Sequence, residues 1–301
     1  FIREPRGDDE MVKLPWITWP LQDALWSELD ECWGRENFCV EKSREQGVTW
    51  LAHAAKPVHD FQFKSGSLIG LCSANQDKVD RIDNEGTMFA MIRFLLANQP
   101  FYLKPDDVAD KLLTIAARSR ENGIDGSPTK PDMFRGDRRR AIGVDEAASI
   151  ANSLEVDQSL TSVTRSRIDV STPKGATGSF FRRTRPDSGT RKVTLHWTIN
   201  PIHSQGLYFD EKGKPRSPWY DAKCRELNNH PVIIAQELDI SYTASDYMYF
   251  LDDKLRLLQE RHARPALKRG KLHYEVVRDK DGRATDVKPI EFIESPAGDL
   301  E

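Results

Sequence analysis

The eight residues from Lys42 to Thr49 have the spacing of a phosphate-binding loop. They follow the short apolar run 38–40 and precede the helix-like stretch 50–55, and strand, tight loop and helix in this order form the setting of such loops. The usual pattern is G-x-x-x-x-G-K-[ST]. Lys42 stands in place of its first glycine, and Val48 stands in place of its lysine. Either the match is a coincidence, or the lysine has moved to the front of the loop.

Further residues along the chain could complete a site for nucleoside triphosphate hydrolysis. Such a site needs backbone N–H groups and a cation around the phosphates, oxygen ligands for Mg²⁺, and a group that orients water. Gly47 lets the loop approach the phosphates, and the helix that follows adds partial positive charge. Thr49 offers a hydroxyl to the metal. Asp145, after the apolar run 141–144, can hold the ion through its water shell, and Glu146 can polarise the attacking water.

Two more positions fit the same chemistry, although each also has an ordinary structural interpretation. The strand-like stretch 167–172 ends in Ser171 and Thr172, whose hydroxyls could sense a γ-phosphate or could simply belong to a strand-to-loop turn. Gln22 could bind an adenine edge just upstream of the loop, whereas the tryptophans near it are typical of core packing.

Composition limits the other classes of function. The chain has 301 residues and a formal charge of −3, so any DNA contact must come from local basic patches. Its four cysteines form no C-x-x-C pair and are predicted to be reduced thiols. No apolar run approaches the roughly 18 residues of a membrane span, so we expect no membrane partner.

The order of the expected elements predicts an α/β fold. Strands alternate with helices at a spacing that favours a mostly parallel sheet covered on both faces. The expected strands are 67–72, 111–116, 141–144, 167–172 and 192–197, and the expected helices in this part are 23–33 and 88–96. The Arg/Gly/Pro-rich segment 118–140 is predicted to be a hairpin or long loop with a basic face. Beyond residue 201 we expect helices at 219–227, 232–238 and 250–261 and a β-hairpin at 270–283 with an Asp-Gly turn.

With these motifs in this order, the chain resembles the large terminase subunits of tailed double-stranded DNA bacteriophages, which are DNA-packaging motor ATPases. The resemblance covers about residues 16–250. It rests on the loop with its lysine at Lys42, on the run 144–148 as Walker B and catalytic glutamate, and on 171–173 as the coupling motif. The segment 234–239 and Ser245 also resemble the region just past the family's ATPase core. The resemblance implies a P-loop NTPase of the ASCE type with a small helical lid or linker subdomain.

The resemblance also implies a role for each matching residue. ATP and Mg²⁺ are the expected cofactors, and Lys42, assisted by Arg44, takes the place of the usual lysine. The expected catalytic residues are Glu146, Arg44 and Thr172, and the expected metal ligands are Thr49 and Asp145. The expected nucleotide-binding residues are Gln22, Lys42, Ser43, Arg44, Glu45, Gln46, Gly47, Val48 and Thr49.

The family further implies partners and a domain plan. The expected partners are double-stranded DNA, the portal protein of the procapsid, a small terminase subunit and further copies of the chain in a ring, expected to be a pentamer, in the host cytoplasm. We expect an ATPase core at 1–200, a helical lid or linker at 201–265 and a β-hairpin linker at 266–301. Residues 263–301 are too few for the family's nuclease domain, so no DNA-cutting activity is expected. The candidates for an arginine inserted into a neighbouring subunit are Arg135, Arg138, Arg139 and Arg140, although such a run is often a solvated turn.

Two other interpretations remain open from the sequence. A helicase-like ATPase is one, but the chain has no room for a second tandem ATPase core. A nucleotide-binding or scaffold module that lost catalysis when Val48 replaced lysine is the other, and it leaves the presence of Thr49 and Glu146 unexplained.

Overall fold

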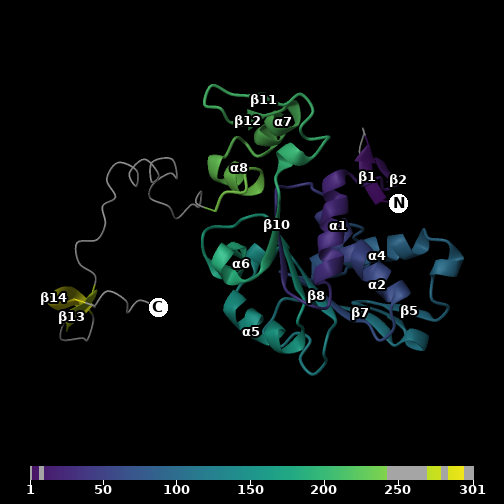
Figure 1. Cartoon of the computed structure of the whole chain (residues 1–301), viewed down its shortest axis with the longest axis horizontal. Coiled ribbons are helices and arrows are strands. Elements are labelled where there is room, and N and C mark those ends of the chain that lie inside the picture. Colours follow the sequence, from purple (N-terminus) through teal and green to yellow (C-terminus); the bar gives the residue numbers. More distant parts are fainter. Residues whose placement is uncertain (1, 7–9, 243–269, 279–283, 295–301) are drawn as a thin grey trace. The chain divides into compact units, whose positions relative to one another are not determined.

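An eight-stranded sheet forms the centre of the computed structural model, which describes residues 2–6, 10–242, 270–278 and 284–294. The strand order is β10-β3-β9-β8-β4-β7-β6-β5; the first six strands run parallel, and β6 and β5 are antiparallel additions at one edge (Figure 1). The strands are β3 Phe38–Lys42, β4 Leu68–Ser73, β5 Val108–Lys111, β6 Thr114–Ala117, β7 Asn122–Pro128, β8 Ala141–Asp145, β9 Arg167–Ser171 and β10 Arg191–Leu195.

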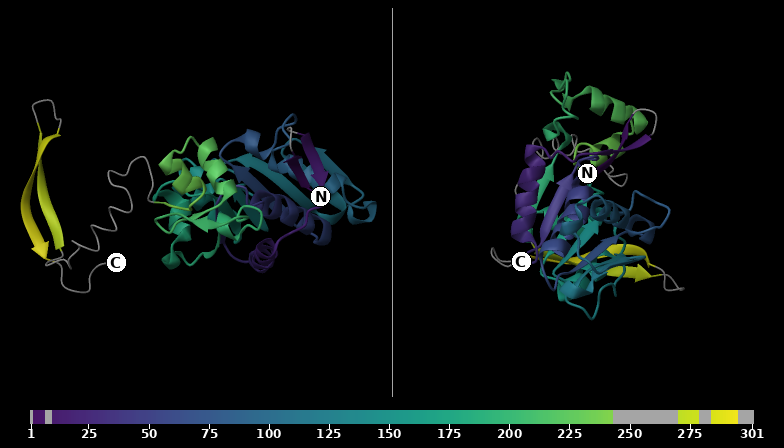
Figure 2. Two further views of the ribbon diagram at one scale, coloured as in Figure 1. Left: turned by 90° about the horizontal axis from the view of Figure 1, so that it is seen from above. Right: turned by 90° about the vertical axis from the view of Figure 1, so that its right-hand side faces the viewer.

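Helices cover both faces of this sheet (Figures 1 and 2). Leu29, Phe61 and Phe89 pack in one buried cluster with the sheet residues Val40 and Leu71. The helices of this layer are α1 Pro20–Cys32, the π-helix η1 Thr49–Ala55, α2 Lys56–Phe63, α3 Gln76–Val79 and α4 Met88–Ala97. The opposite layer contains α5 Ser153–Val163 and α6 Gly178–Thr184. Burial of apolar side chains in both layers provides the main stabilisation of the sheet.

Strand β9 shows how the two faces differ. Its side chains alternate between faces, as in any strand. Ile168 and Val170 join the first core cluster. Arg167 and Asp169 are also almost fully buried, and the Arg167 Nε donates to Asp169 Oδ1 at 2.5 Å. The face covered by α5 and α6 therefore contains a buried ion pair beside its apolar core.

A small helical segment follows β10. It has its own buried cluster of Trp197, Tyr220, Cys224 and Leu238. Its elements are β11 Tyr208–Phe209, β12 Pro215–Arg216, α7 Pro218–Glu226 and α8 Pro231–Glu237. The short 3₁₀ helices among the described residues are η2 Phe101–Leu103, η3 Arg118–Arg120, η4 Ala147–Ser149, η5 Pro186–Ser188 and η6 Trp197–Ile199. The helices expected at 219–227 and 232–238 are confirmed as α7 and α8.

The chain divides into two compact units, 1–249 and 250–301. In the first unit, β1 Ile2–Arg6 pairs antiparallel with β2 Glu10–Leu14. In the second unit, β13 Gly270–Arg278 pairs antiparallel with β14 Ala284–Glu294, which confirms the expected hairpin (Figure 2). The expected Asp-Gly turn and the helix expected at 250–261 lie outside the described residues. No described helix has the length and apolar character needed to cross a membrane.

The predicted α/β class with a mostly parallel sheet is confirmed, but two local predictions are wrong. The strand expected at 111–116 is two antiparallel strands, β5 and β6, because the chain turns at Leu113, whose φ is 61°. The hairpin or long loop expected at 118–140 contains the seven-residue strand β7, which pairs parallel with β4. The glycines of this strand made the segment resemble a loop in the sequence. A Cβ on Gly126 would lie 2.7 Å from Val79 Cγ1 and 2.8 Å from Phe89 Cε2, so close packing explains a residue that usually weakens strands.

Candidate functional site

The carboxyl ends of three parallel strands bring the predicted residues together. Lys42, Ser171 and Asp145 are the last residues of β3, β9 and β8, which are neighbours in that order. Asp145 lies beside Val170 in the register, and Glu41 lies beside Ser171. The three strands therefore end at nearly the same level, and ligands of open parallel sheets bind outside this carboxyl edge.

Thr49 and Asp145 form the centre of the site. Thr49 begins η1, and its Oγ1 donates to Asp145 Oδ1 at 3.5 Å. No group of three or more His, Cys, Asp or Glu residues that could hold a metal is found within the described part of the chain. A hydroxyl and one carboxylate suit Mg²⁺, since this ion keeps several waters and takes further oxygens from substrate phosphates. The donor set therefore fits the expected metal.

His53 lies beneath this pair, one turn further along η1. Its ring is fully buried, and its Nε2 is 3.9 Å from Asp145 Oδ1. Burial lowers the pKa of His53, while the charges of Asp145 and Asp169 oppose that shift. π-Helical turns often occur at functional sites, and here the turn contains both Thr49 and His53. Sequence reasoning missed His53 because a lone histidine in a helix gives no spacing signal.

Lys42 is the cation of the site. Its side chain is partly buried, and it makes no ion pair with any residue that the structure describes. Burial lowers the pKa of Lys42, and Asp145, Glu237 and Glu146 partly oppose the shift by their negative charges. An unpaired ammonium group close to these carboxylates is suited to bind an anion that arrives at the sheet edge.

Val48 cannot take over this role. Its side chain is only 2% exposed and belongs to the core cluster that includes Leu51 and Val58. Only its backbone is left to contact a ligand. The predicted contribution of Val48 to nucleotide binding would therefore come from its N–H group.

Gly47 and Gln22 lie against each other at the turn of the loop. Gly47 has a φ of +69°, and a Cβ added to it would lie 2.8 Å from Gln22 Nε2. The Nε2 of Gln22 donates to the carbonyl oxygen of Gln46 at 3.2 Å. Gln22 is thus in contact with the loop, as the prediction of an adenine-side role requires, and it also supports the loop's conformation.

The front of the loop is held by the helical segment after β10. Ser43 Oγ donates to the Leu238 carbonyl oxygen at 2.5 Å and accepts from the Trp197 N–H at 3.0 Å. Arg44 Nε donates to Glu237 Oε2 at 2.6 Å, and its backbone N–H donates to the Glu237 carbonyl oxygen at 2.8 Å. In this conformation Arg44 is bound to α8.

The middle of the loop is held by the same segment. Glu45 pairs with Lys223 at 2.7 Å between Oε1 and Nζ. Gln46 Nε2 lies 3.4 Å from His203 Nδ1, and the His203 ring stacks on Trp219 with 3.7 Å between ring centroids. Residues 43–46 all contact the segment 197–238, and no sequence motif pointed to these partners.

Glu146 and the coupling motif lie just past the strand ends. Glu146 has a left-handed backbone with φ of 52°, a conformation that costs energy for a non-glycine residue. Its carboxylate forms an ion pair with Lys78, and both side chains are exposed. Ser171 Oγ accepts from the Ala148 N–H at 3.1 Å, so the end of β9 holds the turn that contains Glu146. Thr172 follows and is partly buried.

The four arginines proposed as trans fingers differ in their availability. Arg139 is 7% exposed at its side chain and forms an ion pair with Asp125, so it has a structural role. Arg140 and Arg135 also pair with carboxylates, although they are more exposed. Arg138 is exposed and forms no ion pair with the residues that the structure describes. Arg139 and Arg140 directly precede the amino end of β8, at the edge of the sheet opposite Lys42.

Comparison with solved structures finds proteins with a similar fold. The ATPase domain of the Thermus phage P74-26 large terminase superposes with a TM-score of 0.51 at 16% identity, covering 68% of this chain and 88% of that one. The HK97 bacteriophage large terminase gives 0.56 at 12% identity, covering 92% and 64%. A large terminase from a thermophilic bacteriophage gives 0.52 at 12% identity, covering 73% and 52%.

The chain has the fold of large terminase ATPase domains. It spans about half of the thermophilic bacteriophage's large terminase and about two thirds of the HK97 protein. No protein-family model matches the sequence, and no curated protein matches it. At identities this low, the likeness to terminases concerns the fold alone.

The burial of Val48 predicts the result of restoring a standard loop. We expect Val48→Lys to lower the free energy of unfolding by roughly 3 kcal/mol or more, because it places an unpaired charge in the core. Val48→Ala should cost less, since it removes only apolar contacts. Urea unfolding of the three proteins measures this. A Val48→Lys protein as stable as the parent would show that position 48 opens toward the ligand.

The stacked His203 predicts a pH dependence of stability. Burial lowers the pKa of His203 to about 4; the negative charge of Glu45 opposes this shift, and the positive charge of Lys223 adds to it. Between about pH 4 and pH 6.5 the unfolded chain binds a proton that the folded chain excludes, so stability falls as pH decreases through this range. The unfolding free energy should depend less steeply on pH in His203→Gln than in the parent. Parallel curves for the two proteins would contradict this assignment.

Proposed function

We propose that this chain is an ATP-hydrolysing motor that drives double-stranded viral DNA into a procapsid. The observation that carries the proposal is the 3.5 Å contact between Thr49 Oγ1 and Asp145 Oδ1, close to the ammonium group of Lys42, which forms no ion pair within the described part of the chain. A hydroxyl, a carboxylate and a cation at the carboxyl edge of a parallel sheet are the groups that phosphoryl transfer requires. The fold, shared with terminase ATPase domains, supports the DNA-packaging context.

ATP and Mg²⁺ are the cofactors that this site would take. When bound, Mg²⁺ would neutralise charge on the phosphates, with Thr49 and Asp145 as its protein-side partners. Lys42 would bind phosphate oxygens from the start of the loop. The backbone N–H groups of residues 45–48 would surround the remaining oxygens, since those of Ser43 and Arg44 donate to the carbonyl oxygens of Leu195 and Glu237. The thermophilic bacteriophage's large terminase has been solved in complex with ADP, which supports nucleotide binding at this fold.

Glu146, Arg44 and Thr172 are the proposed catalytic residues. Glu146 would orient the attacking water once its carboxylate leaves Lys78. Arg44 would exchange Glu237 for a phosphate, and this exchange would release one contact between the loop and α8. Thr172 would sense the phosphate state, since Ser171 beside it already holds the turn after Glu146.

The proposed partners follow from the packaging role. They are double-stranded DNA, the portal protein, a small terminase subunit and further copies of this chain in a ring, proposed to be a pentamer, within the host cytoplasm. We propose an ATPase core at 1–200, a lid or linker at 201–265 and a β-hairpin linker at 266–301.

Steady-state ATP hydrolysis tests the assignment directly. We expect Glu146→Gln to reduce kcat by about 10²-fold or more with nucleotide binding retained, because it removes the group that orients water. Lys42→Ala should lower both nucleotide affinity and kcat, and Lys42→Arg should recover part of the affinity. Lys212→Ala is the charge-matched control, because it removes an exposed lysine that is not among the proposed site residues. It should leave the rate of hydrolysis unchanged. Assays should include DNA and the assembled ring.

The competing functions give different results in this assay. A parent chain that binds nucleotide but does not hydrolyse it, with or without DNA, would indicate a scaffold that has lost catalysis. Hydrolysis that survives Lys42→Ala would contradict the displaced lysine. Strand separation by the parent would favour the helicase-like alternative.

A further inference from the structure

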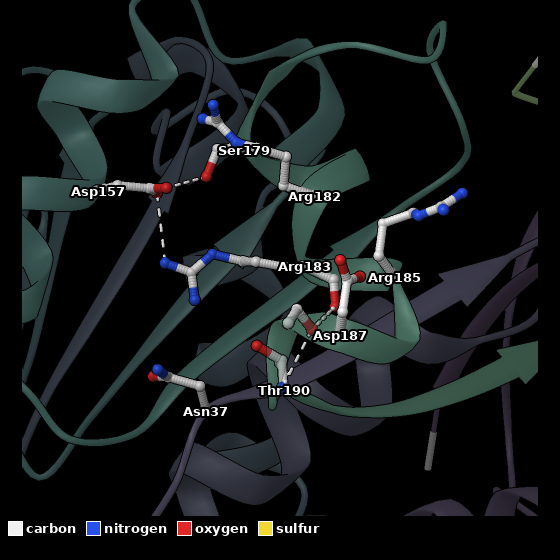
Figure 3. Close-up of a pocket in the computed structure, with 9 residues that line it drawn as sticks. Asn37, Asp157, Ser179, Arg182, Arg183, Arg185, Asp187 and Thr190 are labelled. Atoms are coloured by element: carbon white, nitrogen blue, oxygen red, sulfur yellow. Dashed lines mark hydrogen bonds and ion pairs between the residues drawn. The ribbon is translucent and has the colours of Figure 1, made fainter. Parts of the chain in front are cut away.

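A second basic site lies at the opposite edge of the sheet. A cavity of about 450 Å³ opens at the amino ends of β3 and β10, where Asn37 precedes β3 and Thr190 precedes β10 (Figure 3). Its other lining residues are Asp157, Ser179, Arg182, Arg183, Arg185, Asp187 and Ser188. The five residue steps from Asn37 to Lys42 along β3 separate the cavity from Lys42 by about 17 Å at about 3.3 Å per residue. The cavity is therefore distinct from the proposed nucleotide site.

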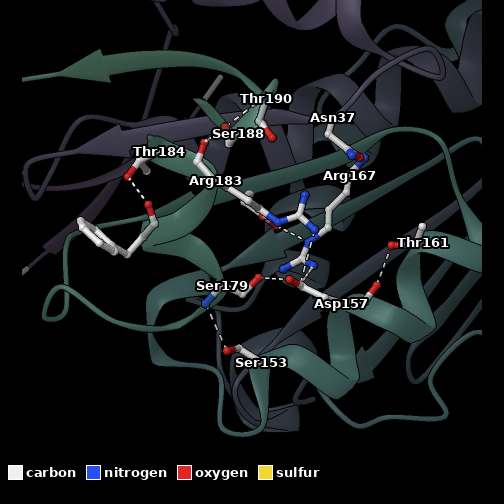
Figure 4. A network of polar contacts seen from close by, with 12 residues as sticks. Asn37, Ser153, Asp157, Thr161, Arg167, Ser179, Arg183, Thr184, Ser188 and Thr190 are labelled. Atoms are coloured by element: carbon white, nitrogen blue, oxygen red, sulfur yellow. Dashed lines mark hydrogen bonds and ion pairs between the residues drawn. The ribbon is translucent and has the colours of Figure 1, made fainter. Parts of the chain in front are cut away.

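A buried ion network forms one wall of the cavity. Arg167 is 3% exposed and binds both Asp157 and Asp169 (Figure 4). Arg183 approaches the same two carboxylates at 3.4 Å each, and Ser179 Oγ donates to Asp157. Two arginines thus share two aspartates. Their charges cancel, and Arg183 is held in a fixed position at the wall.

Asp157 remains an anion in this network. Burial alone would raise the pKa of Asp157, but the charges of Arg167 and Arg183 and the hydrogen bond from Ser179 outweigh burial and lower it. With two arginines and two aspartates, the wall contributes no net formal charge to the cavity.

The rim of the cavity carries an excess of positive charge. Arg182 and Arg185 are exposed and form no ion pair with residues that the structure describes; the Arg185 guanidinium lies 5.7 Å from the Phe181 ring. Asp187 is the only acidic residue at the rim among the lining residues. Two arginines opposite one aspartate leave a net charge of about +1 at the opening.

Neutral donors complete the site. The Oδ1 of Asn37 accepts a hydrogen bond from the backbone N–H of Arg167 at 3.0 Å, which leaves the Asn37 NH₂ group as a donor. Thr190 lines the cavity with a hydroxyl. Arginine with small hydroxyl and amide side chains is the combination that proteins use to contact nucleic-acid phosphates.

We propose that this cavity binds one phosphodiester group of double-stranded DNA through Arg182 and Arg185. The single negative charge of a phosphodiester matches the excess charge of +1, whereas a free di- or triphosphate carries more negative charge than the rim can neutralise. The inference rests on the proposed DNA motor function for its choice of ligand. It uses none of the residues assigned to ATP hydrolysis.

DNA-binding measurements on the full chain test this site. A fluorescent duplex is titrated at several salt concentrations against the parent and against Arg182→Gln/Arg185→Gln. We expect the double variant to bind about 10-fold more weakly at low salt and to reduce the slope of log Kd against log salt by about 1 to 2. Asp187→Asn should tighten binding several-fold, because it removes the negative charge from the rim.

The control has the same change in charge at another place. Arg118→Gln/Arg225→Gln neutralises two exposed arginines outside the cavity and should leave DNA affinity within about twofold of the parent. ATP hydrolysis without DNA should be unchanged in all of these variants, and their thermal midpoints should match the parent. These readouts separate a failure of this site from a failure of the ATPase assignment.

Three outcomes would overturn the proposal. If both double variants bound DNA equally more weakly than the parent, DNA affinity would depend only on the net charge of the chain. Unchanged DNA affinity in Arg182→Gln/Arg185→Gln would show that DNA does not bind here. Pyrophosphate is titrated against the same two proteins, and loss of its binding in Arg182→Gln/Arg185→Gln with DNA affinity retained would identify a small-anion site. Selective loss of DNA binding in a chain that hydrolyses no ATP would support this site while refuting the motor function.

Discussion

The parallel pairing of β3, β9 and β8 is the constraint on which the proposed site depends. Parallel strands end on the same side of the sheet, and their register brings Lys42, Ser171 and Asp145 to nearly the same level. The chain separates Thr49 from Asp145 by 96 residues, yet their side chains approach to 3.5 Å. This approach is produced by backbone hydrogen bonds and by packing on both faces, so the geometry of the site is a property of the whole sheet.

The second constraint is the attachment of the loop to the segment 197–238. Ser43 is bound by backbone groups of Leu238 and Trp197, and Arg44 is bound by Glu237. These contacts fix the front of the loop beside the unpaired Lys42. They also mean that a phosphate that recruits Arg44 must break an ion pair with α8. The nucleotide site and the helical segment are thus coupled through identified hydrogen bonds and one exchangeable ion pair.

The sequence predicted the parts of the molecule that follow from local pattern. Three segments have a local residue pattern that predicts their place in a parallel sheet. They are the apolar run before Asp145, the loop 42–49 and the strand ending at Ser171. Contacts made by tertiary packing could not be predicted in this way. The partners of Ser43 and Arg44 lie nearly 200 residues away and have no motif. Strand β7 was missed because close packing of neighbouring side chains explains its glycines, and no sequence pattern shows that packing. The basic run around Arg139 likewise gave no sign that its side chain is buried and paired with Asp125.

The central claim is that Lys42 supplies the cation that residue 48 supplies in a standard loop. A structure of the chain with Mg²⁺ and a non-hydrolysable ATP analogue tests it most directly. The account predicts Lys42 Nζ at about 3 Å from a β- or γ-phosphate oxygen, Thr49 and Asp145 beside the metal, and Val48 still in the core. A nucleotide bound with Lys42 directed away from its phosphates, or with another cation in that place, would contradict the account.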